Sequence, residues 1–382
     1  MTEMVQYATN EIEPITQEFT LSDGWDDLRS YVQSVVILPT GAVVAPTTAP
    51  FLTELDRYKS AKVTGRGREN VCAMSSSSYT VGEQMELNKA RVRAGVKSPE
   101  AISRLAMFKR KQSTPERLTG RELLRNYKIG DWEKCDYNVD FSKTTPDCIL
   151  YGFAIGDSGS EKSKVIVDTA YSITPFDDSH LNFTLNAPFE NGTMSRNGEV
   201  TSRINSQDHI LPQTFFPSIV TLKDPTEAGF LYVMNNILRT RHYGAQTTRT
   251  GRVRNELIGV IFADGEIVSN LRWTQTIYDL MKEATPTQIN APDPLNEDHV
   301  RQAAEDAIEA LMKKECIPFT ALIGEVFAPL IDEVKQLIGN ESKLKELLMQ
   351  ADTESTAYAQ KHISKSAEKT KKGGKKASAA AE

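Results

Sequence analysis

The stretch RTRHYGAQTTRTGRVRN, residues 239–255, carries five arginines and no carboxylate in a chain whose formal net charge is −6. Guanidinium groups bind phosphates through paired hydrogen bonds, and the two glycines here would let a polynucleotide backbone approach closely. The first two arginines fall in the last turn of a predicted helix, where the helix dipole already favours cations. A solvated charged loop is therefore the alternative, but the absence of acids before Glu256 favours phosphate binding. The candidate residues are Arg239, Arg241, His242, Gly244, Arg249, Arg252 and Arg254.

A second basic segment runs from Lys89 to Lys128, with twelve lysines or arginines against three glutamates. Charge runs are most often solvated helix faces, but two basic segments far apart in one chain support each other as parts of one nucleic-acid surface. Two arginines that flank Gly67 form a third, smaller group. The candidate RNA-binding residues of these segments are Arg66, Arg68, Lys89, Arg91, Arg93, Lys109, Arg110 and Lys111.

Residues that could carry out covalent chemistry are scattered. The five histidines lie far apart in the sequence, and no Gly-x-Ser-x-Gly, Walker-type or His-Glu-x-x-His motif is present. Asp177 and Asp178 could bind a metal ion, but adjacent acids in a loop are more often caps or exposed turns. The sequence therefore favours a binding protein over an enzyme.

The cysteines give no clear metal motif. Cys72, Cys135, Cys148 and Cys316 contain no CxxC pair, which favours free thiols in a cytoplasmic chain. Cys135 and Cys148 are close enough in sequence to share a zinc ion with Cys72 or a histidine, but without a paired ligand motif we predict no metal and no cofactor.

Composition sets the broad class. With 382 residues and 39% hydrophobic residues, the chain can bury a large core. Its longest apolar run, residues 257–263, is far shorter than a membrane span, and the acidic N-terminus has no secretory signal pattern, so we expect a cytoplasmic protein. Residues 281–360 carry fifteen acids against seven bases, which predicts an acidic appendage beside a basic face.

Several short runs predict the elements that position the basic residues. Residues 31–38 are β-branched and apolar and predict a core strand. Ser98 as a cap and Pro99 as a first helical residue predict a helix within the second basic segment. The runs CILYGFAIG and KVIVDTAYSI, which begin at Cys148 and Lys164, both have the composition of strands.

Residues 214–280 have the clearest local pattern. A short strand at 219–222 is followed by Asp224, Pro225 and Glu227, an arrangement typical of a capping box, and by a helix expected to end near Arg241. A buried strand at 257–263, a hairpin turn at Asp264-Gly265, a return strand beginning at 267–268 and a further helix around Trp273 follow. This order predicts an α+β fold with a ferredoxin-like, RNA-recognition-motif-type sheet and helices on one face.

The long polar excursion at 177–213 interrupts this pattern. Such a loop is usually functional or disordered, and its apolar residues could wedge between bases or dock on a neighbouring subunit, although an ordinary surface loop is equally compatible. Its candidate functional residues are Phe189, Met194, Arg196 and Arg203. After 281 the pattern is that of amphipathic helices, and the lysine-rich tail from Lys361 is expected to be disordered.

Several stretches together resemble one protein family. PDCILYGFAIG, SKVIVDTAYSI, NAPFENGTMS and the long segment from Phe215 to Gly265 are similar to the Csc-two family, backbone subunits of subtype I-D CRISPR interference complexes in the Cas-seven superfamily. The similarity covers roughly residues 30–280. It implies an RNA-recognition-motif-like core with inserted subdomains, in several copies that polymerise along a CRISPR guide RNA (crRNA) and present it to a target DNA strand.

The resemblance also implies how the chain is divided. A protruding hairpin, the thumb, would fold over the guide and displace a nucleotide at regular intervals, with Phe189 and Met194 as candidate wedges. Other partners would be neighbouring copies and the large, cap and small subunits. The expected parts are a first core segment (25–60), a basic inserted subdomain (61–130), core strands (131–176), a thumb-like hairpin (177–213), the remaining core with the basic loop of residues 239–254 (214–280), an acidic helical extension (281–360) and a lysine-rich tail (361–382).

Two other functions remain open at this point. Some relatives in type III complexes cut target RNA with a thumb-loop aspartate and a metal, so a backbone subunit that also cleaves bound single-stranded target through Asp177 or Asp178 is the main alternative. A standalone single-stranded RNA binder is the other.

Overall fold

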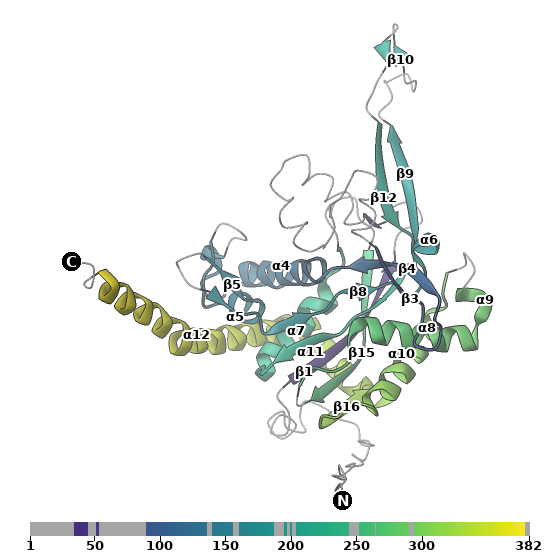
Figure 1. Cartoon of the computed structure of the whole chain (residues 1–382). Coiled ribbons are helices and arrows are strands. Elements are labelled where there is room, and N and C mark those ends of the chain that lie inside the picture. Colours follow the sequence, from purple (N-terminus) through teal and green to yellow (C-terminus); the bar gives the residue numbers. More distant parts are fainter. Residues whose placement is uncertain are drawn as a thin grey trace, which may run out of the picture.

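The computed structural model describes residues 34–44, 51–52, 89–135, 140–155, 160–186, 195–196, 199–200, 204–243, 252–263, 265–289 and 294–378. Its centre is a six-stranded antiparallel sheet (Figure 1). Across the sheet the strands are β16 (Phe319–Ile323), β15 (Arg252–Ala263), β1 (Ser34–Val44), β14 (Val220–Lys223) and β7 (Val165–Val167), with β13 (Phe215–Pro217) paired to the second half of β1.

The two longest strands, β1 and β15, form the middle of the sheet. Leu38 pairs with Gly259 and Pro39 with Leu257, so Ile258 is an extra residue in β15 and the register shifts there. Proline has no N–H to donate to a neighbouring strand, which makes Pro39 compatible with a bulge. The first strand is therefore longer than residues 31–38 predicted, because the bulge lets pairing continue past the proline.

One face of the sheet is covered by a large helical layer. Its apolar residues include Phe230, Val233 and Ile237, all fully buried, which pack on Val260 and Phe262 of the sheet. The helices are α4 (Lys109–Tyr127), α5 (Pro146–Tyr151), α7 (Glu227–Arg239), α11 (Ala328–Gly339) and α12 (Glu341–Ser378). A short helix, η5 (Gly324–Val326), leads into α11.

The opposite face is covered by α8 (Asn270–Ala284) and α10 (Glu297–Met312), with the short α9 (Pro286–Ile289) between them. Trp273 is completely buried, and its indole N–H donates to the Ala304 carbonyl at 3.0 Å. The α+β class predicted from the sequence is confirmed, but helices cover both faces rather than one. Residues 281–360 are not an appendage, because they supply strand β16 and helices to both layers.

The second basic segment contains a strand where a helix was predicted. Residues 101–107 form β4 (Ala101–Met107), which pairs with β3 (Lys89–Arg93) and β8 (Ala170–Tyr171), and the helix begins only at Lys109. The guanidinium of Arg104 is completely buried and donates to the carbonyls of Ser172, Ile173 and Ala94. These contacts fix the three-stranded sheet, and local propensity at Ser98 and Pro99 could not reveal them.

Two other local predictions were wrong. The run beginning at Cys148 lies in α5 and the two-residue strand β5 (Phe153–Ala154), which pairs with β6 (Ser160–Glu161). Pro146 begins α5, where its missing N–H costs nothing, so the run starts as a helix. The second pairing partner of β15 is β16, fifty-six residues further on, rather than a return strand at 267–268.

The cap of α7 also differs from the prediction. Thr226 is the N-cap, and its hydroxyl accepts a hydrogen bond from the Gly229 N–H at 3.1 Å. Asp224 instead adopts a left-handed conformation with φ of 46°, so it ends the preceding strand rather than starting the helix.

A two-stranded antiparallel ribbon protrudes from the body of the molecule (Figure 1). It consists of β9 (His180–Asn186) and β12 (Ile204–Ile210), with β2 (Phe51–Leu52) paired beside β12, and the four-residue α6 (Phe176–Ser179) lies at its base. Further out, β10 (Ser195–Arg196) pairs with β11 (Glu199–Val200). The predicted wedge residues Phe189 and Met194 lie outside the described residues, as does Arg203.

Helix α12 is the last element. It extends to Ser378, so the structure continues the helix into the tail that was expected to be disordered from Lys361. Lysine and alanine favour this continuation, whereas Gly373 and Gly374 oppose it. None of the described helices has the length and apolar composition needed to cross a membrane.

Candidate nucleic-acid interface

A small hydrophobic cluster brings the separate basic segments together. It contains Leu105 and Met107 from β4, Tyr243 after α7 and Val253 at the start of β15. Phe176 and Ile210, at the base of the ribbon, belong to the same cluster. The start of α4, the two ends of the basic loop and the base of the ribbon therefore meet at one place, which we call the ribbon-base cluster.

Polar contacts hold the segment after α7 against α4. The Tyr243 hydroxyl donates to Oε1 of Glu116 at 3.0 Å and accepts from the Asn255 side chain at 2.7 Å. The hydroxyls of Thr119 and Thr240 lie 3.0 Å apart. These bonds fix the direction in which the chain leaves α7 and enters the basic loop.

The start of α4 concentrates positive charge. Phe108 is the N-cap and supplies no side-chain hydrogen bond, and the first turn contains no acid. Lys109 and Arg110 are exposed there, although cations at a helix N-terminus interact unfavourably with the helix dipole, by about 0.3–1 kcal/mol each. This arrangement costs stability in the isolated chain and would favour an anionic partner.

Three further side chains of the basic loop are exposed beside this helix. Arg241 and His242 follow α7, and Arg252 begins β15. The Val253 N–H donates to the Arg241 carbonyl at 2.7 Å, so Arg241 and Arg252 lie next to each other. Neither arginine forms an ion pair with another residue in the described ranges. The basic surface consists of Lys109, Arg110, Arg241, His242 and Arg252.

Other residues of the predicted site lie elsewhere. Lys111 is 4% exposed and so cannot present its ammonium on the surface. Arg254 forms ion pairs with Glu256 and Glu297, and Arg239 donates to the Asn235 side chain and the Ile338 carbonyl. Carboxylates and carbonyls thus occupy both guanidinium groups, and we leave Lys111, Arg239 and Arg254 out of the basic surface.

Strand β3, the first strand of the second basic segment, starts beside the ribbon-base cluster and runs away from it. Lys89 pairs with Leu105, next to the cluster, whereas Arg91 and Arg93 pair with Ser103 and Ala101 at the far end of β4. The backbone of Arg196 is in β10, towards the far end of the ribbon. Arg66, Arg68, Gly244 and Arg249 lie outside the described residues.

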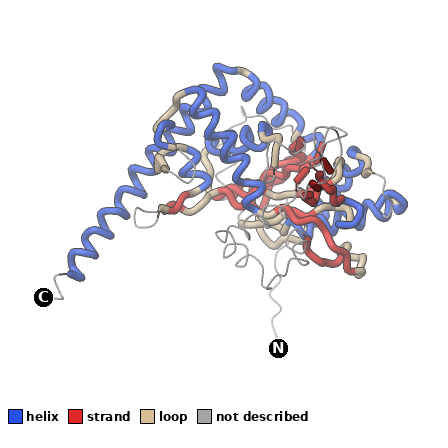
Figure 2. Tube along the Cα trace, turned by 90° about the horizontal axis from the view of Figure 1, so that it is seen from above, coloured by secondary structure: helices blue, strands red, loops and turns tan. Residues whose placement is uncertain are grey.

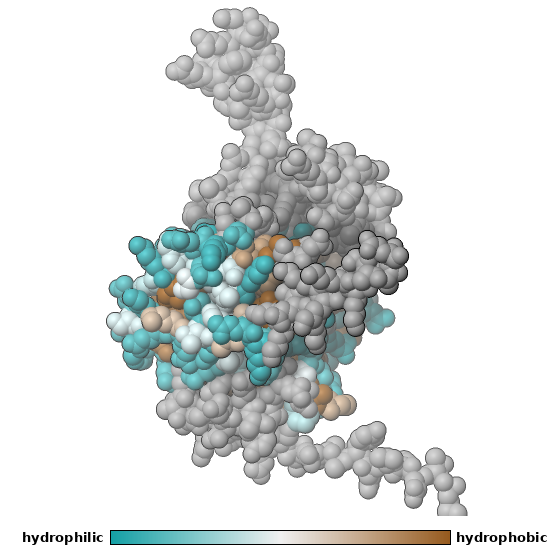
Figure 3. Space-filling model, turned by 90° about the vertical axis from the view of Figure 1, so that its left-hand side faces the viewer, coloured by the Kyte–Doolittle hydropathy of each residue, from teal (hydrophilic) through white to brown (hydrophobic). Residues whose placement is uncertain are grey.

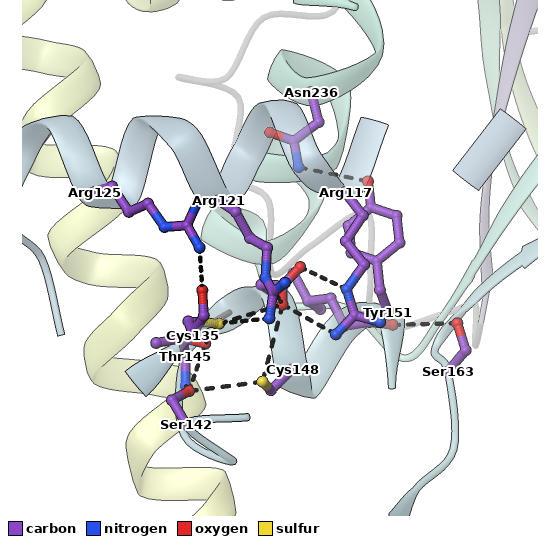
Figure 4. Close-up of polar contacts among 12 residues, drawn as sticks. Arg117, Arg121, Arg125, Cys135, Ser142, Thr145, Cys148, Tyr151, Ser163 and Asn236 are labelled. Carbon is purple, nitrogen blue, oxygen red and sulfur yellow. Dashed lines mark hydrogen bonds and ion pairs between the residues drawn. The ribbon is translucent and has the colours of Figure 1, made fainter. Parts of the chain in front are cut away.

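A second polar cluster, which sequence reasoning missed, is buried between α4 and α5 (Figure 4). Asp147 is completely buried and accepts from Arg117 Nε at 2.7 Å and from Arg121 Nε at 2.9 Å. Arg121 also donates to Cys135 Sγ at 2.9 Å. The four-residue spacing of the two arginines on a helix was the available signal, since it places both on one face.

This cluster has the donor atoms of a metal site. Ligand atoms of Cys135, Asp147 and Cys148 lie within 4.8 Å of one another. A hydrogen bond from Cys135 lowers the pKa of Cys148 to about 6, and the same bond, with burial, raises the pKa of Cys135. Two guanidinium groups already neutralise the Asp147 carboxylate. The arginines thus supply the positive charge that a bound cation would bring, and the donor set does not favour a metal.

The two adjacent acids of the alternative nuclease hypothesis lie in α6 at the base of the ribbon. Asp177 is exposed, and burial, together with the charge of Asp177, raises the pKa of Asp178. Within the described part of the chain, no third His, Cys, Asp or Glu donor joins them. A pair of carboxylates without further ligands is weak support for a catalytic metal.

Comparison with known proteins identifies the family of this chain. A family model described as Csc2 Crispr matches residues 60–348, well over half of the sequence. The chain belongs to the Csc2 CRISPR family. The resemblance to this family, inferred from four stretches that include the segment from Phe215 to Gly265, is thereby confirmed at the level of the Csc2 family.

One solved structure shares the fold of this Csc2-family chain. The crystal structure of Thermofilum pendens Csc2 is similar with a TM-score of 0.50 at 15% identity, over 88% of this chain and 96% of that chain. A chain in the structure of a CRISPR RNA-guided surveillance complex aligns with a TM-score of 0.41 at 10% identity, over 76% and 89% of the two chains. No curated protein sequence matches the chain.

Glu116 should make the stability of this Csc2-family chain depend on pH. Burial raises the pKa of Glu116 to about 8 against its ordinary value of 4.5, although the hydrogen bond from Tyr243 opposes this change. The folded state therefore prefers the protonated acid. The resulting stability is fully present below about pH 4.5 and is lost as the pH rises towards 8, by about 1.4 kcal/mol for each pH unit between these two values.

The variant Glu116→Gln cannot titrate and should lose this pH dependence. Urea unfolding at pH 5, 7 and 9 measures the free energy of unfolding of both proteins. We expect this free energy to fall for the wild type relative to Glu116→Gln as the pH rises. The exposed Glu122→Gln on the same helix is the control and should follow the wild type. If the free energy of unfolding changes with pH in the same way for Glu116→Gln and the wild type, Glu116 is ionised in the folded protein.

Proposed function

We propose that this chain is a crRNA-binding backbone subunit of a type I-D interference complex in the cytoplasm. The observation that carries the proposal is the convergence of exposed cations from distant segments around the ribbon-base cluster: Lys109 and Arg110 from α4, and Arg241 and Arg252 from the two ends of the basic loop. Cations that bind a ribose-phosphate backbone need no sequence preference, because base pairing of the guide reads the target.

In this proposal the β9–β12 ribbon is the thumb. A two-stranded ribbon that protrudes beside a basic surface can fold over a bound strand and push a nucleotide out of the stack. The central sheet and its helices would be an elaborated RNA-recognition-motif-like core. The thumb residues Phe189, Met194, Arg196 and Arg203 and the basic residues Arg66, Arg68, Lys89, Arg91, Arg93 and Arg249 stay candidates for contacts to the guide.

Several copies would lie head to tail along one guide, and the assembly would present the guide to a target DNA strand. Partners would include neighbouring copies and the large, cap and small subunits of the complex. Covalent chemistry is not required of this subunit. No third metal-binding side chain in the described ranges joins Asp177 and Asp178, so this pair gives the nuclease alternative no additional support.

The mass of the RNA–protein particle tests this function. Reconstitution with guides of increasing length should give particles whose protein mass rises in equal steps, because each copy covers a fixed number of nucleotides. Native mass spectrometry measures these steps. One copy per RNA at every length would instead identify a standalone single-stranded RNA binder.

A further inference from the structure

The C-terminal end of α12 lies beyond the packed body of the molecule. Leu344, Leu347, Leu348 and Ala351 anchor the first part of the helix in the core, and Ile363 packs on a smaller apolar cluster that contains Cys135, Cys148 and Phe153. From there the helix runs on to Ser378 and points away from the body (Figures 1 and 2). Fifteen further residues correspond to about 22 Å of helix.

The sequence of this projecting part is strongly basic. Residues 364–378 contain six lysines, a single acid, Glu368, and no apolar residue larger than alanine. Four of the lysines recur at intervals of four, three and four residues, which places these positions along one side of the helix. They are Lys365, Lys369, Lys372 and Lys376.

Such a helix is poorly stabilised by itself. Like charges three or four residues apart repel, and the pair Gly373-Gly374 costs about 1 kcal/mol per glycine relative to alanine. Without an apolar face, packing on another protein cannot offset these terms. Where described residues are visible on the side from which α12 projects, their surface is mostly hydrophilic, with separate apolar patches (Figure 3). These features favour a polyanion over an apolar partner.

We infer that the projecting end of α12 binds the sugar-phosphate backbone of a nucleic acid, at a second site separate from the basic surface. A row of four lysines along about 16 Å of helix matches the closely spaced phosphates of a nucleic-acid strand. The basic surface lies around the ribbon-base cluster, whereas α12 leaves the body past α5 on another side (Figure 1). The projecting end of α12 would therefore bind its nucleic acid at a place separate from the basic surface.

Salt dependence of binding is the most direct test. In the full-length chain, Lys365, Lys369, Lys372 and Lys376 are replaced by glutamine, which removes charge but keeps helix propensity. The matched control replaces four exposed lysines of the described body: Lys313, Lys314, Lys343 and Lys345. Fluorescence anisotropy then measures affinity for a 30-base-pair DNA duplex and for a 30-nucleotide RNA strand between about 50 and 300 mM NaCl.

The tail variant should lose at least about tenfold in affinity near 100 mM salt, and the slope of log K against log salt should fall by about 3, whereas the control should keep the wild-type slope. A loss confined to the duplex assigns the site to DNA, and a loss confined to the strand assigns it to RNA. Unchanged slopes in both arms overturn the inference. The inference would also be overturned if the tail variant differed from the wild type in molecular mass in solution without nucleic acid, while the salt slopes stayed the same. That result would indicate a protein partner.

The outcome is independent of the proposed function. The tail variant should retain guide RNA through the basic surface. Loss of guide RNA from basic-surface variants tests that surface alone, so either proposal can fail without the other.

Discussion

The double variant Arg241→Glu/Arg252→Glu is expected to lose guide RNA, with an affinity at least about 100-fold below that of the wild type. Each arginine is exposed, lies beside the other through the Val253–Arg241 backbone hydrogen bond, and forms no ion pair within the described residues. A charge-assisted hydrogen bond contributes about 1.5–3 kcal/mol, so the loss of two contacts, with added repulsion, accounts for this decrease. Filter binding at fixed salt measures it.

A matched control separates this effect from net charge. Lys313→Glu/Lys314→Glu makes the same change in charge at exposed positions after α10 and should bind RNA with near wild-type affinity. Thermal melting should show both variants folded, since none of the four side chains is buried. Equal RNA loss in the two variants would mean that binding depends on overall charge rather than on the basic surface.

Asp147→Asn is expected to destabilise the fold by about 3–5 kcal/mol. The Asp147 carboxylate is completely buried and binds both Arg117 and Arg121. The amide removes the negative charge and leaves two guanidinium groups in the interior without compensation. Urea denaturation at neutral pH, followed by far-ultraviolet circular dichroism, measures the loss.

An exposed aspartate on the same side of the fold provides the comparison. Asp131 pairs with Lys134 at 3.7 Å on the surface, and Asp131→Asn should change stability by less than about 1 kcal/mol. If the two variants unfold at the same urea concentration, the buried ion pairs contribute no more than a surface pair, and α4 and α5 are held together by apolar packing alone.

The sequence predicts the elements whose apolar pattern is local. Helix α7, most of β15 and α8 follow from periodicity and turn residues within a few positions of each element. β4 and α5 do not, because Arg104 and Asp147 obtain their partners from segments tens of residues away. The partner of β15 is likewise set by tertiary pairing with β16.

The basic residues of the candidate site were predictable as a set but not individually. Arg104, Arg117, Arg121 and Lys111 contribute to the positive count of the second basic segment, yet the structure buries all of them or pairs them with Asp147. The sequence shows how many charges a segment carries but not which way each side chain points. Only the fold separates the cations that stabilise the interior from those that face solvent. Lys109, Arg110 and Arg252 belong to the second group.

A cryo-EM map of the chain assembled on a guide RNA tests the central claim most directly. We expect the RNA backbone to follow the basic surface, with phosphates within hydrogen-bonding reach of Arg110, Arg241 and Arg252, and with the ribbon crossing the strand. RNA density on another face of the molecule, with these side chains in solvent, would contradict the proposal.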